Sequence, residues 1–513
     1  MKNFWGSISV VSGATMVSRI LGLLRDVLFF ATFGASMFGE AFLLAFTFPN
    51  LFRRMLGEGT LNSAFLPVFT TAWNETGRNR AWALLNQIVS RMLLYLGVLA
   101  LLICLGSWSV SYCFADDGQK WFFAARLNGI TFAYLIFICT SAILVGALNV
   151  RGRFFEGAIS PVILNLCMII CLVLAQLFAF QDLGWVACLL GISVVGAGCL
   201  QLWLPWRALK VRESWGWSID LSGSSDLNSV KSLFWVGALG AAVAQVNLLI
   251  SRFLAYSLDE TGGLSFLYMA ARMVELPLGV FAIAISTVLF PKLSKASTQG
   301  NAKGYEEAFF LGMRTIGAIT LPSAVGLYVL ADPILRLLFQ WNAFGPEETV
   351  QAVNVLRIAA WTIPFYAYSS FMVKAFHSEK NMTTPYHGAI VSLLINLIAS
   401  LVLMQKYGVL GLAWANFISA FSQLVFLCWK NQSLQMGDWL APRKISSFSP
   451  LLGCTCMYFL LAFLLPRLTQ IDGKTGDLIT LSVLVPSAIL SFFLVLKMMR
   501  FSWTLTASKQ KGS

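Results

Sequence analysis

Apolar segments long enough to cross a bilayer recur along the whole of this 513-residue chain. A helix needs about 20 mostly apolar residues to span a hydrocarbon core of about 30 Å. Hydrophobic residues make up 58% of the sequence and charged residues only 12%, a balance outside the range of soluble globular domains. The sequence therefore predicts an all-α polytopic membrane protein.

We predict fourteen membrane-spanning helices. The predicted spans are 8–32, 40–70, 82–112, 121–148, 159–180, 184–206, 229–254, 264–290, 307–330, 350–374, 385–405, 408–429, 447–466 and 478–498. The first span is expected to be a retained helix rather than a cleaved signal peptide, because arginines interrupt it and no small-residue cleavage site follows it.

Basic residues are distributed unevenly between the predicted loops. With the N-terminus inside, the cytoplasmic segments hold 21 Lys and Arg residues, whereas the outer loops hold five. Because Lys and Arg are enriched on the cytoplasmic side of membrane proteins, both termini are predicted to be cytoplasmic. This topology accounts for most of the net charge of +13, with contact to anionic membrane lipids as a second contribution. Nucleic-acid binding is not needed to explain the charge.

A polar segment and a weak internal repeat predict the domain organisation. The segment 207–230 is rich in Ser and Gly and follows the sixth span. The motif Phe65-Leu66-Pro67 resembles Leu289-Phe290-Pro291 at an offset of 224 residues, and a second motif pair has an offset of 228. Duplicated halves are typical of transporters whose site lies between them. We predict an N-terminal lobe (1–206), a cytoplasmic linker (207–230), a C-terminal lobe (231–430) and a final region (431–513) with two helices and a basic tail.

Ionisable residues inside the apolar spans predict the functional site. A charged group at membrane depth costs a few kcal/mol and usually faces a bundle interior or a water-filled cavity. The candidates are Arg19, Arg25, Asp26, Arg53, Arg54, Glu58, Arg272 and Glu275. Their five positive and three negative charges leave a positive surplus, which suits an anionic ligand.

Helical spacing suggests three ion pairs within this set, and these could be purely structural. The pairs are Arg19 with Asp26, Arg54 with Glu58, and Arg272 with Glu275. They use neither Arg25 nor Arg53. Because the planar guanidinium matches phosphate oxygens, the two remaining arginines favour a phosphate or pyrophosphate ligand.

The other embedded arginines lie nearer to predicted helix ends and are expected to snorkel to the interface. They are Arg91, Arg126, Arg252, Arg314 and Arg357. The ten cysteines are expected to be packing residues. No cofactor, metal site or disulfide framework is predicted, because His377 and His387 are the only histidines and the cysteine spacing does not fit zinc.

Several motifs together resemble a known family. They are Ser18-Arg19-Ile20-Leu21-Gly22 followed by Arg25-Asp26, then Phe48-Pro49-Asn50-Leu51-Phe52-Arg53-Arg54, Glu58-Gly59, Ala64-Phe65-Leu66-Pro67 and Arg272-Met273-Val274-Glu275-Leu276-Pro277. These motifs resemble the MurJ (MviN) family of bacterial lipid II flippases. That family belongs to the multidrug/oligosaccharidyl-lipid/polysaccharide (MOP) exporter superfamily. The resemblance covers about the first 400 residues, and the last two helices match only in hydrophobicity.

The resemblance implies a fold, a cargo and a location. The fold would have two six-helix lobes in a V-shaped arrangement, with two C-terminal helices lining a groove for a lipid tail. The cargo would be lipid II, the undecaprenyl-pyrophosphate-linked disaccharide-pentapeptide, moved to the outer leaflet of the bacterial inner membrane for peptidoglycan synthesis. Cell-wall synthesis and division proteins would be partners. The functional residues of the family correspond to Arg19, Arg25, Arg53 and Arg272, with the acids Asp26 and Glu58.

Two departures from the family pattern bear on mechanism. Many members carry an acid just before the arginine of the eighth helix, whereas this chain has Ala270-Ala271-Arg272. Some relatives are proposed to bind sodium among the seventh, eleventh and twelfth helices. Those spans contain no Asp or Glu here, and neutral groups such as Asn247, Asn396 and Asn416 remain. A carboxylate-ligated sodium site is therefore not expected.

Three other interpretations compete with a lipid II flippase. Another MOP-type exporter, for polyprenyl-linked glycans or drugs, would share the architecture, although cationic drugs do not suit an arginine-rich site. A membrane glycosyltransferase would require catalytic carboxylates on an outer loop, where Asp116-Asp117 is the only candidate pair. A scaffold for the cell-wall machinery would not need charges at membrane depth.

Overall fold

The computed structural model of the chain consists of helices joined by short connections. It describes residues 2–55, 61–113, 119–279, 283–431, 449–469, 473–499 and 501, with their side chains except at 2–10, 113, 235–241 and 283. No strand occurs among the described residues. The prediction of an all-α protein is therefore confirmed.

The chain divides into two compact units, which are described separately. Unit 1 contains Met1–Leu249 and Trp341–Phe344, and unit 2 contains Ile250–Gln340 and Gly345–Ser513. The helices that begin in unit 1 are α1 (Lys2–Phe33), α2 (Met37–Phe52), α3 (Leu61–Thr71), η2 (Ala72–Thr76), α4 (Arg78–Cys113), α5 (Gln119–Thr131), α6 (Tyr134–Val150), α7 (Phe155–Leu177), α8 (Leu183–Arg212) and α9 (Ser225–Ser257).

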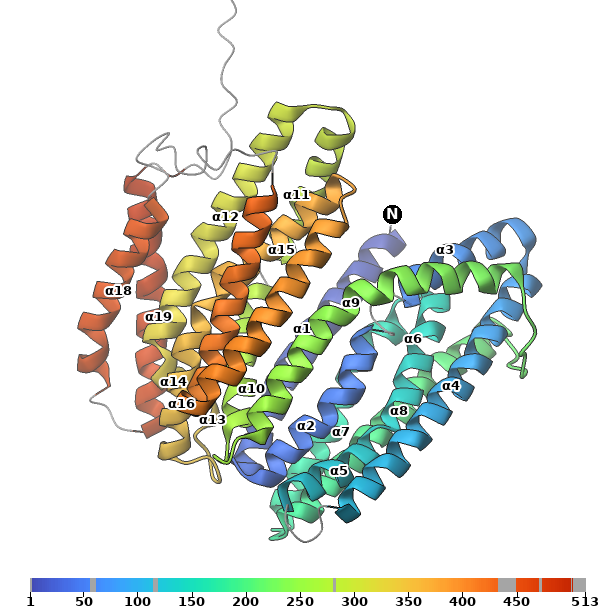
Figure 1. Cartoon of the computed structure of the whole chain (residues 1–513), viewed down its shortest axis with the longest axis horizontal. Coiled ribbons are helices and arrows are strands. Elements are labelled where there is room, and N and C mark those ends of the chain that lie inside the picture. The colour runs from blue at the N-terminus through green and yellow to red at the C-terminus, as the bar shows by residue number, and fades with distance from the viewer. Residues whose placement is uncertain are drawn as a thin grey trace, which may run out of the picture. The chain divides into compact units, whose positions relative to one another are not determined.

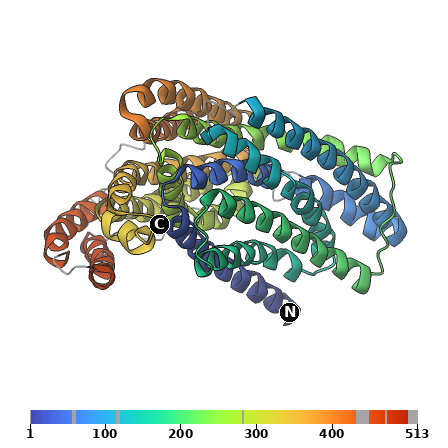
Figure 2. The same cartoon turned by 90° about the horizontal axis from the view of Figure 1, so that it is seen from below.

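Unit 2 begins at Ile250, within the last turns of α9, and its other helices follow. They are α10 (Gly263–Pro277), α11 (Ile283–Thr298), α12 (Ala302–Val329), α13 (Ala331–Phe339), α14 (Pro346–Ala360), α15 (Thr362–Ser378), α16 (Thr383–Lys430), α18 (Ser449–Leu468) and α19 (Gly473–Met498). The views in Figures 1 and 2 show α18 and α19 side by side, and α12 packs against α18.

Unit 1 has its core where α3, α4, α6 and α8 meet. Phe65, Phe69, Leu85 and Leu144 are buried there among aliphatic side chains. Polar N-caps begin two of the helices, and at α8 the carboxylate of Asp182 accepts the Gly184 N–H at 2.8 Å. This cap satisfies a backbone donor that has no partner inside the helix.

A short segment from the second half of the sequence belongs to unit 1. The Ala343 N–H donates to the carbonyl of Ala31 at 3.2 Å, and the ring of Phe344 lies 6.0 Å from that of Phe30. Gly34 has a φ of +59°, and a Cβ atom there would lie 2.3 Å from the Ala343 carbonyl oxygen. Glycine is therefore required at this close approach.

The segment between α8 and α9 is bound to α4 over most of its length. We call residues 213–224 the strap. Trp215 is buried, and its indole N–H donates to the side-chain oxygen of Asn86 at 2.8 Å. Arg91 donates to the carbonyls of Leu221 and Ser222 at 2.7 and 2.8 Å. Arg91 therefore binds the strap, and its expected snorkelling to the interface stays a prediction.

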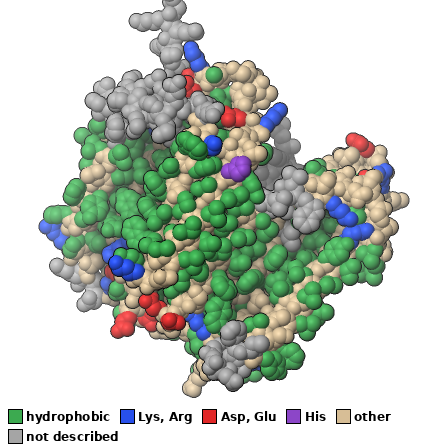
Figure 3. Space-filling model, viewed as in Figure 1, with side chains coloured by type: hydrophobic (Ala, Val, Ile, Leu, Met, Phe, Trp, Pro, Cys, Tyr) green, Lys and Arg blue, Asp and Glu red, His purple; other side chains and the backbone are tan. Residues whose placement is uncertain are grey.

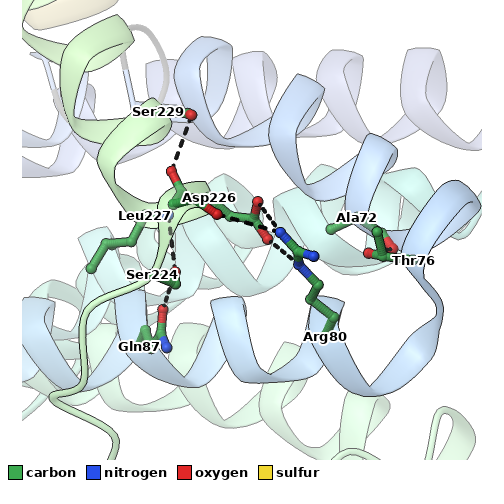
Figure 4. A network of polar contacts seen from close by, with 9 residues as sticks. Ala72, Thr76, Arg80, Gln87, Ser224, Asp226, Leu227 and Ser229 are labelled. Carbon is green, nitrogen blue, oxygen red and sulfur yellow. Dashed lines mark hydrogen bonds and ion pairs between the residues drawn. The ribbon is translucent and has the colours of Figure 1, made fainter.

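An ion pair lies just after the strap, where α9 begins (Figure 4). Arg80 donates through Nε and Nη2 to the two carboxylate oxygens of Asp226, at 2.8 and 2.9 Å. The hydrogen bond from Arg80 lowers the pKa of Asp226 below its ordinary value. Beside this pair, the Ser224 hydroxyl donates to Gln87 at 2.7 Å. The strap is thus joined to α4 by both apolar and polar contacts.

Unit 2 contains two apolar clusters that share α12. One lies among α11, α12, α15 and α16, around Phe309 and Phe371. The other joins α12 to α18 and α19, around Leu461, Leu484 and Phe492. The last two helices are therefore packed onto unit 2 through its own core.

Helix breaks divide several predicted spans. The span 40–70 was predicted as one helix, but α2 ends at Phe52 and α3 begins at Leu61. The span 264–290 is likewise divided, because α10 ends at Pro277 and α11 begins at Ile283. A π-helical turn follows each first helix, at 53–55 and at 278–279. Insertions of this kind often lie at functional sites.

The surface agrees with a membrane protein. Figure 3 shows hydrophobic side chains over the middle of the helices, with Lys, Arg, Asp and Glu mainly near their ends. Eight helical stretches in the described part of the chain are long and apolar enough to cross a membrane. The multi-pass prediction is supported, while the count of fourteen stays a prediction.

Candidate functional site

A buried ion pair in α1 forms the centre of the candidate site in unit 1. Arg25 donates to Oδ1 of Asp26 through Nε at 3.0 Å and through Nη2 at 2.6 Å. Both residues are buried, with 7% and 4% of their surface exposed. Each charge in this low-dielectric setting is therefore compensated by its neighbour.

An amide from α7 completes this arrangement. The Asn165 side-chain oxygen accepts from Nη1 of Arg25 at 3.1 Å, and its Nδ2 donates to the carbonyl of Ser18 at 3.0 Å. The packing of α1 along α7 brings these groups together. Asn165 therefore fixes the Arg25 guanidinium relative to both helices. Asn165 was not predicted as a site residue, because nothing in its local sequence distinguishes it from a packing asparagine.

This geometry corrects the pairing predicted within α1. Asp26 was expected to pair with Arg19, seven residues earlier, but it pairs with Arg25. Adjacent helical residues do not normally face each other, yet the long arginine side chain reaches its neighbour. Arg19 is exposed and makes no hydrogen bond or ion pair with the described residues.

A second arginine of unit 1 lies in the π-helical turn after α2. Arg53 donates through Nε and Nη2 to Oδ1 of Asn50, at 3.0 and 2.9 Å. Arg54 follows it and is partly buried. Its predicted partner Glu58 lies outside the described residues, so that pairing stays a prediction. The wide turn places two consecutive arginines where the helical hydrogen-bond pattern is interrupted.

Unit 2 contributes a cationic group on α10. Arg272 donates to Glu275 at 3.2 Å, so the predicted pairing is confirmed, although both side chains are partly exposed. The guanidinium carbon of Arg272 lies 5.7 Å from the centre of the Tyr268 ring. Arg252 of α9 lies 5.4 Å from the same ring. The prediction that Arg252 only snorkels missed this shared aromatic contact.

Chemically, each unit carries arginine forks on or beside broken helices. Arg25 is oriented by a carboxylate and an amide, and Arg53 by the amide of Asn50. Such preorganised guanidinium groups suit phosphate oxygens, since the fork offers parallel N–H donors. The described arrangement contains no nucleophile activated by a base, and it fits binding better than covalent catalysis.

Comparison with known proteins decides the family. The family described as lipid II flippase MurJ matches residues 29–484. The chain belongs to the MurJ family.

Individual MurJ relatives agree with this assignment. A probable lipid II flippase MurJ of Bdellovibrio bacteriovorus is 33% identical over 440 residues, covering 83% of this chain and 82% of the relative. The corresponding protein of Vibrio cholerae is 31% identical over 438 residues, covering 82% and 81%. MurJ proteins are flippases, so the chain is a transporter rather than an enzyme.

Solved structures show the same fold. A lipid II flippase MurJ in an inward closed conformation has a TM-score of 0.76 and 26% identity, covering 95% of this chain and 98% of that chain. A multidrug resistance MATE family transporter of the MOP superfamily has a TM-score of 0.66 at 14% identity, covering 82% and 97%. The second likeness concerns the fold alone.

Serine and asparagine side chains of α9 and α16 form a hydrogen-bonded network in unit 2. In unit 2, the Asn396 amide donates to the Ser251 hydroxyl at 2.8 Å, and Ser251 donates to the Asn416 side-chain oxygen at 3.3 Å. Ser400 donates to the other end of Asn396 at 3.2 Å. These neutral groups hydrogen-bond to one another, and the expectation that a carboxylate-ligated sodium site is lacking stays a prediction. The geometry is that of a hydrogen-bonded contact between α9 and α16.

Proposed function

We propose that this chain moves lipid II from the inner to the outer leaflet of the bacterial cytoplasmic membrane for peptidoglycan synthesis. The match to the MurJ family over residues 29–484 carries this proposal. The matched region covers 82% and 81% of the lengths of two relatives named as probable lipid II flippases. The step requires no covalent chemistry.

The arginines would hold the pyrophosphate of the cargo. Arg25 is oriented by Asp26 and Asn165, so its fork does not need to be ordered when a ligand arrives. Arg19 lies on the same helix, α1, and is exposed. It forms no ion pair with a described residue, so it can bind an anion without first breaking one. The complete proposed set of substrate-binding residues is Arg19, Arg25, Asp26, Arg53, Arg54, Glu58, Arg272 and Glu275.

The acids in that set would have supporting roles. Asp26 keeps Arg25 in place, and Glu275 does the same for Arg272 at 3.2 Å. An acid beside each arginine lowers the cost of a charged group in the membrane when no cargo is bound. It also prevents the site from holding the anion too tightly to release it.

Transport would proceed by alternating access between the lobes 1–206 and 231–430, joined at 207–230. The helix breaks after α2 and α10 offer places where the backbone can bend. The final region 431–513 would line a groove for the lipid tail. The membrane potential contributes about 2.3 kcal/mol per elementary charge per 100 mV to any step that moves net charge.

The proposed orientation has both termini in the cytoplasm. It rests on the basic residues of the predicted loops and places the strap and Asp226 on the cytoplasmic side. Membrane lipids would contact the apolar belt, and cell-wall synthesis and division proteins would be partners. Another MOP-type exporter activity is the alternative, and the arginine forks argue against cationic cargo.

Binding of lipid II tests the proposal directly. Purified chain in nanodiscs would be titrated with lipid II, comparing Arg19→Gln with Arg467→Gln, which removes an exposed arginine of α18. We expect Arg19→Gln to weaken binding about tenfold, the effect of one lost charge-assisted contact. Equal affinity for both variants would remove Arg19 from the site, and no binding by wild type would reject lipid II as the cargo.

A further inference from the structure

Arg314 of α12 is a partly buried cation that the cargo site does not use. Its Nε and Nη2 atoms are shielded from solvent and have no hydrogen-bond partner among the described residues. The guanidinium carbon lies 4.1 Å from the centre of the Phe501 ring. No ion pair joins Arg314 to any residue in the described ranges. The expectation that Arg314 snorkels to the interface stays a prediction.

The position of Arg314 along unit 2 is defined by Phe501. That residue follows the end of α19 at Met498, so the guanidinium lies level with the end of this helix. Phe501 belongs to the apolar cluster that joins α12 to α18 and α19. Arg314 is twelve residues into α12, about 18 Å along its axis at 1.5 Å per residue. The start of α12 reaches past the end of α19 in Figure 1.

This setting leaves the guanidinium incompletely satisfied. Stacking on Phe501 uses the face of the group, whereas its N–H donors point outward in its plane. Arginine does not deprotonate in proteins, so it cannot relieve the burial by becoming neutral. A buried donor without a partner in a folded protein commonly marks an ion or water site.

We propose that Arg314 binds the phosphate of an anionic phospholipid at the end of α12 and α19. Its fork matches phosphate oxygens, and the end of a membrane helix is the level at which headgroup phosphates lie. The side chain of Arg314 is partly exposed, so a ligand at the surface can reach it. The last turns of α19 carry exposed apolar side chains, including Leu490, Phe493 and Leu494, against which acyl chains can pack. These side chains favour a lipid over free phosphate.

This site is separate from the proposed cargo arginines. Arg314 shares no described contact with Arg272 or Arg252, the other arginines discussed in unit 2. Lipid binding at Arg314 would stabilise the packing of α18 and α19 on α12 whether or not cargo is present. The inference therefore stands or falls independently of the lipid II proposal.

The test uses the full chain purified in a neutral detergent. Native mass spectrometry would count retained phosphatidylglycerol, and thermal unfolding would be followed with phosphatidylglycerol, phosphatidylcholine or inorganic phosphate added. For wild type we expect retained phosphatidylglycerol and a higher unfolding temperature with that lipid only. Arg314→Gln should reduce the apparent affinity for phosphatidylglycerol about tenfold.

Arg467→Gln is the matched control, because Arg467 also stacks on a phenylalanine, 3.7 Å from the Phe463 ring, but is exposed. It should behave as wild type. Arg314→Lys should restore part of the lipid effect if Arg314→Gln folds poorly. Equal phosphatidylglycerol retention by wild type and Arg314→Gln would overturn the proposal. Equal stabilisation of wild type by inorganic phosphate would assign the site to a free anion and also overturn it.

Discussion

Arg25 is held by two kinds of partner, a carboxylate beside it in α1 and an amide from α7. Both contacts orient the guanidinium, and the carboxylate of Asp26 compensates its charge. Removing one member of a buried ion pair leaves the other charge buried without compensation. The stability that Arg25 contributes therefore depends on its ion pair with Asp26.

The first prediction concerns this pair. Asp26→Asn should lower the free energy of unfolding by about 3 kcal/mol, because Arg25 stays charged and buried. Adding Arg25→Gln should recover part of that loss, since the uncompensated charge is then removed. Unfolding by SDS in mixed micelles measures both variants. A double variant whose loss equals the sum of the two single losses would show that the charges are not coupled.

The second prediction concerns the backbone at Gly408, where α16 kinks. Gly408 has φ +54° and ψ −131°, and a Cβ atom would lie 2.7 Å from the Glu260 carboxylate. Gly408→Ala should cost about 2 kcal/mol, because residues other than glycine are strained in this region. Gly97→Ala is the control, since nothing lies within 4 Å of its Cβ position in α4. A similar, small effect of both substitutions on unfolding would contradict a strained kink.

At the scale of elements, the strap decides how α8 continues into α9. Its sequence is polar and rich in Ser and Gly, which is typical of a flexible linker. In the structure it is anchored by Trp215 and by hydrogen bonds to Asn86 and Arg91. The sequence could not show this, because the acceptors for Arg91 are backbone carbonyls some 130 residues away.

The third prediction compares two tryptophans of the strap. Trp215 is 2% exposed and Trp217 is 38% exposed. Trp215→Ala should destabilise the strap by about 3–5 kcal/mol, through the cavity and the lost bond to Asn86. Trp217→Ala should have a clearly smaller effect. Hydrogen exchange of peptides covering residues 213–228 measures the difference, and equal protection in both variants would show that Trp215 is not the anchor.

The fourth prediction concerns pH at the start of α9. The hydrogen bond from Arg80 lowers the pKa of Asp226 in the folded state. The stability gained from the ionised Asp226 is therefore complete above the ordinary aspartate pKa of about 3.9. That contribution is lost as the pH falls through the lowered pKa of the folded state. The rate of amide hydrogen exchange near Asp226, corrected for the intrinsic rate at each pH, should therefore be unchanged from pH 7 to 5 and higher below about pH 4. Asp226→Asn should abolish this transition, and a transition near pH 6 would contradict the assignment.

The helix breaks show what local sequence can and cannot predict. Every predicted span coincides with helix over most of its length, because apolar segments of this size must satisfy their backbone groups internally. The interruptions were missed, since the motifs around Pro49 and Pro277 lie within continuously apolar sequence. Proline within a membrane helix is tolerated without a break, so its presence does not locate one.

At the scale of the whole molecule, the sequence predicted the membrane-protein class and the arginines of the site. It did not predict most of the residues that contact those arginines. Arg25, Arg53 and Arg272 were chosen because charge is costly in the membrane, a property of each residue alone. Asn165 and Tyr268 became visible only when α7 and α10 were placed. Ser251, Asn396 and Asn416 were named from the sequence as neutral groups or found beside them, and their hydrogen bonds to one another also appeared only in the structure. Membership of the MurJ family relates these observations to a single function, that of a lipid II flippase.

Rescue of a bacterium depleted of its own lipid II flippase tests the central claim most directly. Wild type, Arg19→Ala and Arg467→Ala would be compared at equal membrane levels, with outer-leaflet lipid II and growth as readouts. Arg19 is exposed, so its loss should leave folding intact. We predict that wild type and Arg467→Ala restore both readouts, while Arg19→Ala reduces outer-leaflet lipid II at least severalfold. Lipid II that stays in the inner leaflet despite correctly inserted wild-type protein would contradict the proposed function.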